Sequence, residues 1–215
     1  MQPNVKITAT ISKCLPEFGH INRFFDKHTG MATAKILPGE YYVSCEDEII
    51  STVLGSCISA CIRDPIFGVG GMNHFMLPDN GEIAKGAAGA ASLATRYGGF
   101  AMEHLINDIL KYGGKKKNLE FKLFGGARVI SGLGASHVGQ RNCEFVRNYL
   151  QTEGFSITSE DMLGQNPRKV LYYPKSGRVR VKLIEKLHND TIVQRERQYQ
   201  TSLDSSPVEG DIELF

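Results

Sequence analysis

Two stretches of the chain carry apolar residues at the spacing of an amphipathic helix. The first runs from Met102 to Leu110, with apolar side chains at i, i+3, i+4, i+7 and i+8, and Gly113 follows it as a C-cap. The second begins at Phe145 and ends at Gly154. Each pattern predicts a helix with one buried face.

Other stretches show the pattern of strands. Apolar and charged residues alternate over 119–123, which is typical of a half-buried strand. Residues 169–173 and 178–183 flank a short loop and predict a hairpin. Between 41 and 76 the chain is rich in β-branched, small and apolar residues broken by glycine and proline, which indicates several short strands.

Strands and helices interleave without a regular βαβ rhythm, so the pattern favours an α+β fold: packed mixed or antiparallel sheets flanked by about three helices, in a single domain. Residues 1–37 lack sustained periodicity, and we expect an irregular N-terminal arm there. Residues 38–198 form the predicted domain. Residues 199–215 contain acidic residues but no lysine or arginine, which predicts an acidic, flexible C-terminal tail.

Composition narrows the class of protein. The 215 residues include 25 lysines and arginines against 23 aspartates and glutamates, a formal net charge of +2, and this near balance argues against a dedicated nucleic-acid binder. No apolar run is long enough for membrane insertion, and the first residues lack the hydrophobic core of a secretory signal. We therefore expect a cytoplasmic protein. Its five cysteines are unevenly spaced and predict free thiols.

The candidate chemistry centres on Cys57. It follows Gly55 and Ser56, where a tight backbone can present a side chain together with free N–H groups. A neighbouring imidazolium lowers the pKa of a thiol from its usual value of about 8.5, and the resulting thiolate can attack a carbonyl carbon. The N–H of Cys57, with a second donor near Gly55 and Ser56, would hold the oxyanion.

His74 is the candidate partner of this thiol. The segment 64–68 reads Asp-Pro-Ile-Phe-Gly, which is a turn signal. Antiparallel pairing of 57–63 with 69–76 across the turn gives paired residue numbers that sum to 131 or 132. Cys57 then lies opposite His74 or its immediate neighbour, within reach of a thiol–imidazole contact. His74 would take the thiol proton and return it to the leaving group.

Nearby polar residues are candidates for supporting roles. Ser51 and Thr52 offer hydroxyls that could orient the imidazole. Asn73, beside the histidine, is a candidate for contacting the substrate or the oxyanion.

Two other interpretations of the same residues stay open. A cysteine and a histidine in apolar strands are also common core residues. A zinc site formed by Cys57, Cys61 and His74 is disfavoured, because residues four apart on a strand lie about 13 Å apart, too far to share one ion.

Six short stretches carry a family resemblance: Pro38-Gly-Glu-Tyr-Tyr42, Leu54-Gly-Ser-Cys57, Arg63-Asp-Pro65, Gly70-Gly-Met-Asn-His-Phe-Met-Leu-Pro78, Phe124-Gly-Gly-Ala127 and Gly139-Gln-Arg-Asn142. With them the chain resembles the CheD family, the chemoreceptor glutamine deamidases, over about residues 36–185. The resemblance implies an α/β fold with packed sheets and flanking helices, similar to the deamidating cytotoxic necrotizing factor toxins.

The resemblance also implies a Cys–His–Thr site. Carried over to this chain, Cys57 is the nucleophile and His74 the general base and acid. The family's threonine aligns six residues before the cysteine, at Ser51, whereas the threonine of this chain is Thr52, five residues before it. Both residues stay candidates for the third position.

The implied reaction hydrolyses a glutamine side-chain amide on a methyl-accepting chemotaxis receptor, through a γ-glutamyl thioester, to give glutamate and ammonia. It needs no metal or organic cofactor. The resemblance further implies pairing with a CheC-type phosphatase. Two alternatives stay open: a non-catalytic regulator of the same fold that binds receptors or the phosphatase, and a thiol methylesterase that acts on receptor glutamyl esters.

Overall fold

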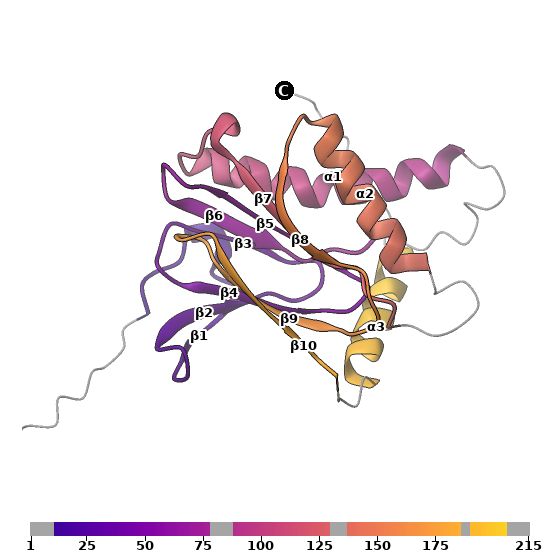
Figure 1. The fold of residues 1–215 in the computed structure, drawn as a ribbon, viewed down its shortest axis with the longest axis horizontal. Coiled ribbons are helices and arrows are strands. Elements are labelled where there is room, and N and C mark those ends of the chain that lie inside the picture. The colour runs from indigo at the N-terminus through magenta and orange to yellow at the C-terminus, as the bar shows by residue number, and fades with distance from the viewer. Residues whose placement is uncertain (1–10, 78–87, 130–136, 186–189, 206–215) are drawn as a thin grey trace, which may run out of the picture.

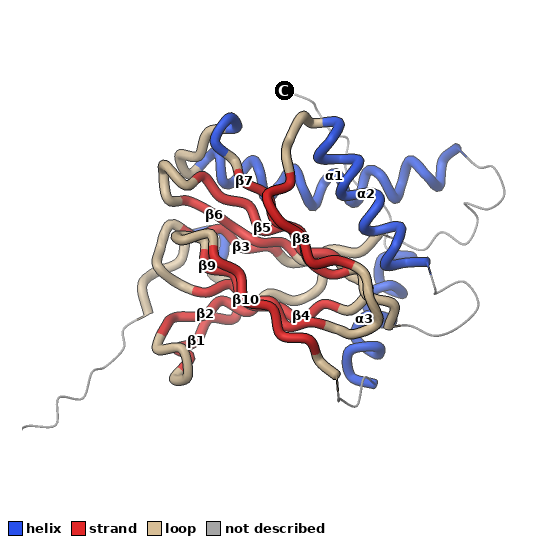
Figure 2. Tube along the Cα trace, in the orientation of Figure 1, coloured by secondary structure: helices blue, strands red, loops and turns tan. Residues whose placement is uncertain are grey.

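A computed structural model of the protein describes residues 11–77, 88–129, 137–185 and 190–205. Two five-stranded sheets face each other, and their facing sides form the core (Figures 1 and 2). This arrangement of sheets and helices in one compact unit confirms the predicted α+β fold.

The first sheet has the strand order β1-β2-β4-β9-β10, and the second has the order β3-β6-β5-β7-β8. The strands of the first sheet are β1 (Asn22–Asp26), β2 (Met31–Lys35), β4 (Ile49–Leu54), β9 (Arg168–Tyr173) and β10 (Arg178–Leu183). Those of the second are β3 (Tyr41–Ser44), β5 (Ile58–Asp64), β6 (Val69–Asn73), β7 (Glu120–Gly125) and β8 (Ile157–Met162).

Three α-helices complete the described fold: α1 (Ala88–Lys111), α2 (Val138–Thr152) and α3 (Asp190–Ser205). Short 3₁₀ helices are formed by Pro16–Phe18 and Lys116–Asn118. α1 packs on β3, β5 and β6, and α2 packs on β5 and α1, so both helices cover the outer face of the second sheet. α3 stands at one end of the sandwich (Figure 1).

The two helices predicted from apolar spacing are confirmed. Met102, Leu105 and Ile109 on α1 are fully buried, and α1 ends just before Gly113, whose φ of +101° suits a glycine. α2 buries Val146 and Leu150. The predicted strand at 119–123 corresponds to β7, and the predicted hairpin corresponds to β9 and β10.

The chain differs from the expectation at both ends. The segment expected to be an irregular arm contributes β1 and β2 to the first sheet. Their apolar residues do not alternate cleanly, and Phe24 and Phe25 stay exposed by about 40%, so the strand pattern is weak. At the other end, α3 runs across the expected boundary between residues 198 and 199, while residues 1–10 and 206–215 lie outside the described part. Across the described residues, none of the helices has the length and apolar character that a bilayer crossing requires.

Candidate active site

The hairpin that carries the two candidate residues forms as predicted, but in a different register. β5 and β6 are antiparallel, with Asp64 paired to Val69, so paired residue numbers sum to 133 rather than 131 or 132. The turn explains the difference. Asp64 Oδ1 accepts hydrogen bonds from the N–H groups of Ile66 and Phe67, and Gly68 closes the loop at φ +69°. This turn geometry fixes which residues pair.

The corrected register moves His74 from directly opposite Cys57 to a diagonal position. The ladder continues beyond β6, where Ile58 and Phe75 exchange two backbone hydrogen bonds of 2.9 Å. Continuing it puts Met76 opposite Cys57 and leaves His74 two residues away, on the same face. Diagonal neighbours have Cα atoms about 7–8 Å apart, with Cβ atoms somewhat closer, still within reach of an imidazole.

His74 is held from the opposite sheet by Thr52. Thr52 Oγ1 lies 2.7 Å from His74 Nδ1 and 2.9 Å from the carbonyl oxygen of Ile36. A carbonyl only accepts, so the single hydroxyl proton goes to Ile36, and Thr52 Oγ1 must accept the hydrogen of Nδ1. This pair of contacts fixes the tautomer and leaves a lone pair on Nε2 of His74.

The strand geometry of β4 distinguishes Thr52 from Ser51. Alternate residues of a strand face the same side, and Thr52 shares its face with Ile50 and Leu54, which belong to the core between the sheets. Ser51 therefore faces away from His74. The alternation Ile50, Thr52, Leu54 is visible in the sequence and could have favoured Thr52 beforehand.

His74 is a neutral base in this environment. Its side chain is 3% exposed, and burial lowers its pKa to about 3. Nε2 has no hydrogen-bond partner among the described residues. A buried nitrogen with a free lone pair is suited to accept a proton from a group that enters the site.

The turn between β4 and β5 presents its N–H groups in one direction. Each of its carbonyl oxygens accepts a hydrogen bond from a neighbouring segment. The N–H groups of Ala127 and Gly126 donate to Gly55 O at 2.7 Å and to Cys57 O at 2.8 Å. The Asn142 side-chain amide donates to Ser56 O at 2.8 Å. With the carbonyls so fixed, the three N–H groups form a concave set of donors of the kind that binds anions. The sequence motifs around 124–127 and 139–142 thus support the turn, a role that spacing alone did not reveal.

A carboxylate from α3 fills this set of donors. Glu196 Oε1 accepts from the N–H of Gly55 at 2.9 Å and of Cys57 at 3.4 Å, and Oε2 accepts from the N–H of Ser56 at 3.1 Å and its hydroxyl at 2.7 Å. Glu196 is only 3% exposed. Sequence reasoning missed this residue, because the contact joins positions about 140 residues apart.

Cys57 is fully buried beneath this carboxylate. Burial, followed by the negative charge of Glu196 and hydrogen bonding to it, raises the pKa of the Cys57 thiol well above its ordinary value. The expected thiolate is therefore not the form favoured here. The site holds a neutral thiol, a neutral imidazole and an occupied anion-binding turn.

Asn73, the other candidate for substrate contact, lies between strands. Its Oδ1 accepts from the N–H of Ala60 at 2.8 Å, and its Nδ2 donates to the carbonyl of Ala101 at 3.0 Å. The amide thus bridges β5 and α1 where the β5–β6 ladder opens. These contacts favour a structural role for Asn73 over contact with the oxyanion.

No group of three or more metal-ligating side chains occurs within the described ranges. Cys61 is buried on β5 with its pKa raised well above the ordinary value by burial. The described residues around Cys57 offer an acid–base and an anion-binding arrangement.

Comparison with known proteins gives a consistent family. Residues 76–183 match the family model described as CheD chemotactic sensory transduction. A protein of Hahella chejuensis named probable chemoreceptor glutamine deamidase CheD is 55% identical, over 94% of this chain and 93% of its own. Proteins of the same name from Halorhodospira halophila and Herminiimonas arsenicoxydans are 52% and 54% identical, over 96% and 90% of this chain and 95% and 94% of their own. The chain belongs to the CheD family.

Proposed function

We propose that this protein hydrolyses the side-chain amide of glutamines on methyl-accepting chemotaxis receptors, with Cys57 as nucleophile. The proposal is carried by His74, whose imidazole is oriented by Thr52 and whose Nε2 is left without a partner among the described residues. The ladder that pairs Ile58 with Phe75 brings it near the turn at Cys57, where three backbone N–H groups bind a carboxylate. The names of the relatives supply the substrate class.

In the first half of the reaction, Nε2 of His74 takes the proton of the Cys57 thiol as sulfur attacks the amide carbon. The amide oxygen becomes an oxyanion, which the N–H groups of Gly55, Ser56 and Cys57 stabilise. His74 then gives the proton to the departing nitrogen. Ammonia leaves, and a γ-glutamyl thioester remains on Cys57.

In the second half, water attacks the thioester carbon while His74 takes one of its protons. The tetrahedral intermediate collapses, sulfur leaves and regains the proton, and the receptor side chain is released as glutamate. No step needs a metal or an organic cofactor. Thr52 keeps the same imidazole nitrogen available throughout, because its contact with Ile36 prevents it from donating to Nδ1.

Each event adds one negative charge to the cytoplasmic helical bundle of a receptor, so we place the reaction in the cytoplasm. Like charges on adjacent helices repel, and receptor signalling bias should shift. A CheC-type phosphatase is the expected regulatory partner from the family resemblance.

Mass spectrometry of a glutamine-bearing receptor fragment tests the proposal. The chain should convert specific glutamines to glutamates, and Cys57→Ala should abolish the conversion while keeping the thermal midpoint of unfolding close to that of the wild type. Equal conversion by Cys57→Ala would exclude Cys57 as nucleophile. Absence of conversion both by the wild type and by Glu196→Ala, in which the donors are freed, would refute the function itself.

A further inference from the structure

Helix α3 supplies the occupant of the candidate active site. Its Glu196 carboxylate takes up the N–H groups of Gly55, Ser56 and Cys57 and the Ser56 hydroxyl. The fit depends on a bare backbone, because a Cβ at position 55 would collide with Glu196 Oε1. A carboxylate held by four donors, 3% exposed, is built into the site rather than resting on it.

The chemical identity of this occupant matches the proposed reaction. Hydrolysis of a glutamine amide yields a glutamate carboxylate, and Glu196 is a glutamate carried on a helix. Its oxygens lie on the donors that the oxyanion of the tetrahedral intermediate would use. Glu196 therefore resembles the product still bound in the site.

The position of Glu196 conflicts with the proposed reaction. It excludes a second carbonyl group from the donors, and it acts directly on the thiol of Cys57, which is fully buried. Its charge also disfavours ionisation of the thiol, adding to the effect of burial on the Cys57 pKa.

One face of α3 makes the contacts between this helix and the rest of the protein. Ile192, Glu196 and Tyr199 follow at i, i+4 and i+7, the spacing of a single helix face. Ile192 and Glu196 are buried, and the Tyr199 hydroxyl forms a hydrogen bond with that of Tyr97 on α1. The ring of Tyr199 also lies against Gly39, where a Cβ would come within 3.1 Å of it.

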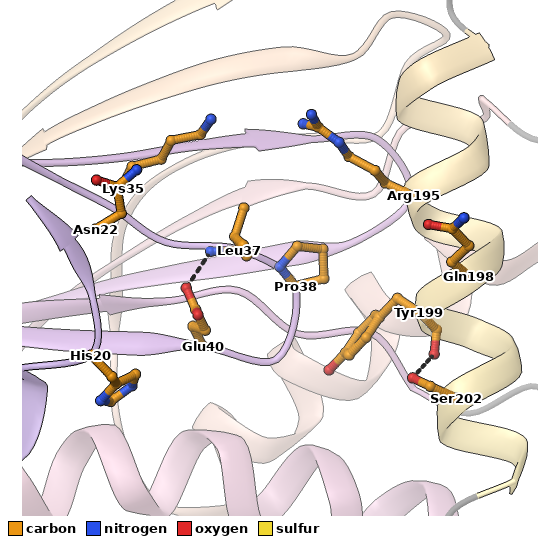
Figure 3. Close-up of a pocket in the computed structure, with 10 residues that line it drawn as sticks. All are labelled: His20, Asn22, Lys35, Leu37, Pro38, Glu40, Arg195, Gln198, Tyr199 and Ser202. Carbon is orange, nitrogen blue, oxygen red and sulfur yellow. Dashed lines mark hydrogen bonds between the residues drawn. The ribbon is translucent and has the colours of Figure 1, made fainter.

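The neighbouring face of α3 is open. A cavity of about 650 Å³ separates part of the helix from the segment 35–40, with Arg195 and Gln198 on the helix side and Lys35 and Leu37 opposite (Figure 3). Among the described side chains of α3, only Ile192 and Glu196 are buried. Among the described side chains of α3, the apolar contacts that oppose release of the helix are those of Ile192 and Tyr199, and release breaks no strand pairing.

We propose that α3 is an intramolecular, product-like inhibitor: Glu196 occupies the position of the target glutamine's side-chain carbonyl, and a receptor helix must displace α3 to reach Cys57. The inference rests on the proposed function. In this proposal the free protein is closed, and binding of the receptor substrate opens it.

Alkylation of single cysteines by iodoacetamide, followed by peptide mapping, tests the closed form in the full chain. Glu196→Ala should raise the alkylation rate of Cys57 at least about fivefold over the wild type, as expected for a typical coupling between two sites. Gln194→Ala, which alters an exposed residue of the same helix, should leave the rate unchanged. The buried thiols of Cys61 and Cys143 serve as internal controls.

A milder variant guards against loss of folding. Tyr199→Phe removes only the hydroxyl bonded to Tyr97 and should raise Cys57 alkylation in the same direction, by a smaller factor. An unchanged Cys57 rate in Glu196→Ala, or a parallel rise at Cys61 and Cys143, would overturn the proposal.

Receptor deamidation separates this proposal from the proposed function. Glu196→Ala should raise kcat/KM for a receptor fragment at least about fivefold, whereas Gln194→Ala should not. If the wild type and Glu196→Ala deamidate the fragment equally, with both activities abolished by Cys57→Ala, the inhibitory role of α3 is refuted and the deamidase stands. If neither chain acts on the fragment, the proposed function fails.

Discussion

At the scale of single residues, the orientation of one imidazole matters most. Thr52 Oγ1 lies between the Ile36 carbonyl, which can only accept, and Nδ1 of His74; its single proton goes to the carbonyl, so the oxygen accepts the Nδ1 hydrogen. A hydroxyl at this position therefore specifies the tautomer without adding charge. In a site where burial already lowers the pKa of His74, a carboxylate in the same place would instead favour the imidazolium.

Removing that hydroxyl tests the role of Thr52. Thr52→Val keeps the shape of the side chain but leaves Nδ1 and the Ile36 carbonyl unpaired, and kcat for receptor deamidation should fall on the order of 10²-fold. Thr52→Ser should restore most of the loss. Ser51→Ala, whose side chain lies on the other face of β4, is the matched control and should stay near wild type. A larger loss in Ser51→Ala than in Thr52→Val would reverse the assignment.

Only some residues of the site could be predicted from the sequence. Cys57, His74, Gly55 and Ser56 were predicted from local motifs and a hairpin, and the structure brings them to one region. Glu196 could not be predicted, because only the fold brings it to a turn about 140 residues away. Local patterns predict neighbours along strands, whereas a contact of this range depends on the packing of whole elements.

At the scale of elements, the backbone around Cys57 is held by the end of β7. Gly126 adopts φ +70° and donates its N–H to the Cys57 carbonyl at 2.8 Å. A Cβ at Gly126 would overlap the sulfur of Cys143 on α2. Three elements thus meet behind the turn that presents the N–H donors.

A comparison of Gly126 with Gly154 separates the cost of a left-handed backbone from the cost of overpacking at this junction. Gly154 has nearly the same φ, +74°, but a Cβ there meets nothing within 4 Å. Gly154→Ala should therefore cost only the left-handed penalty of about 1–2 kcal/mol in the free energy of unfolding. Gly126→Ala should cost about 1–3 kcal/mol more from overpacking, and should also slow deamidation by moving Cys57.

Urea denaturation of both variants measures these costs. Adding Cys143→Ala to Gly126→Ala makes room for the new methyl group and should recover part of the lost stability. Equal destabilisation by Gly126→Ala and Gly154→Ala would show that the new methyl group at position 126 fits beside Cys143 without a loss of stability from overpacking.

Elements with a regular apolar stripe were the ones that sequence patterns predicted. α1, α2, β7 and β9 each bury one face against a sheet or helix, and β10 half-buries Val179 and Val181, so period and burial agree. α3 was not predicted, because the centre of its buried stripe is a glutamate, which breaks the apolar pattern. The same glutamate therefore occupies the site and prevents α3 from being predicted by its apolar pattern.

At the scale of the whole molecule, the site spans both sheets. Thr52 comes from the first sheet and His74 from the second, so their hydrogen bond crosses the interface, as does the bond from the Tyr172 hydroxyl to the Ile62 carbonyl at 3.2 Å. Global stability and site geometry are therefore linked through a buried, neutral histidine.

This link predicts how stability depends on pH. In the folded protein the pKa of His74 is about 3, against 6.5 for the free side chain, so unfolding takes up a proton between these values. Stability is therefore lost as pH falls below about 6.5, by at most about 1.4 kcal/mol per pH unit from this residue. His74→Gln lacks this contribution.

Urea denaturation between about pH 7 and pH 4.5 measures the effect. The stability difference between wild type and His74→Gln should shrink as pH falls, whereas the difference for Gln194→Ala, which removes no titratable group, should stay constant. A constant difference for His74→Gln would mean that the imidazole is not held neutral in the folded protein.

Trapping the thioester shows whether the Cys57 sulfur attacks the glutamine amide. Hydroxylamine added during the reaction with a receptor fragment intercepts a γ-glutamyl thioester as a hydroxamate, which mass spectrometry locates. We expect hydroxamate at the same glutamines that otherwise become glutamate, and none with Cys57→Ala. Glutamate formation without any hydroxamate, or hydroxamate that persists in Cys57→Ala, would show that the reaction does not pass through a thioester on Cys57.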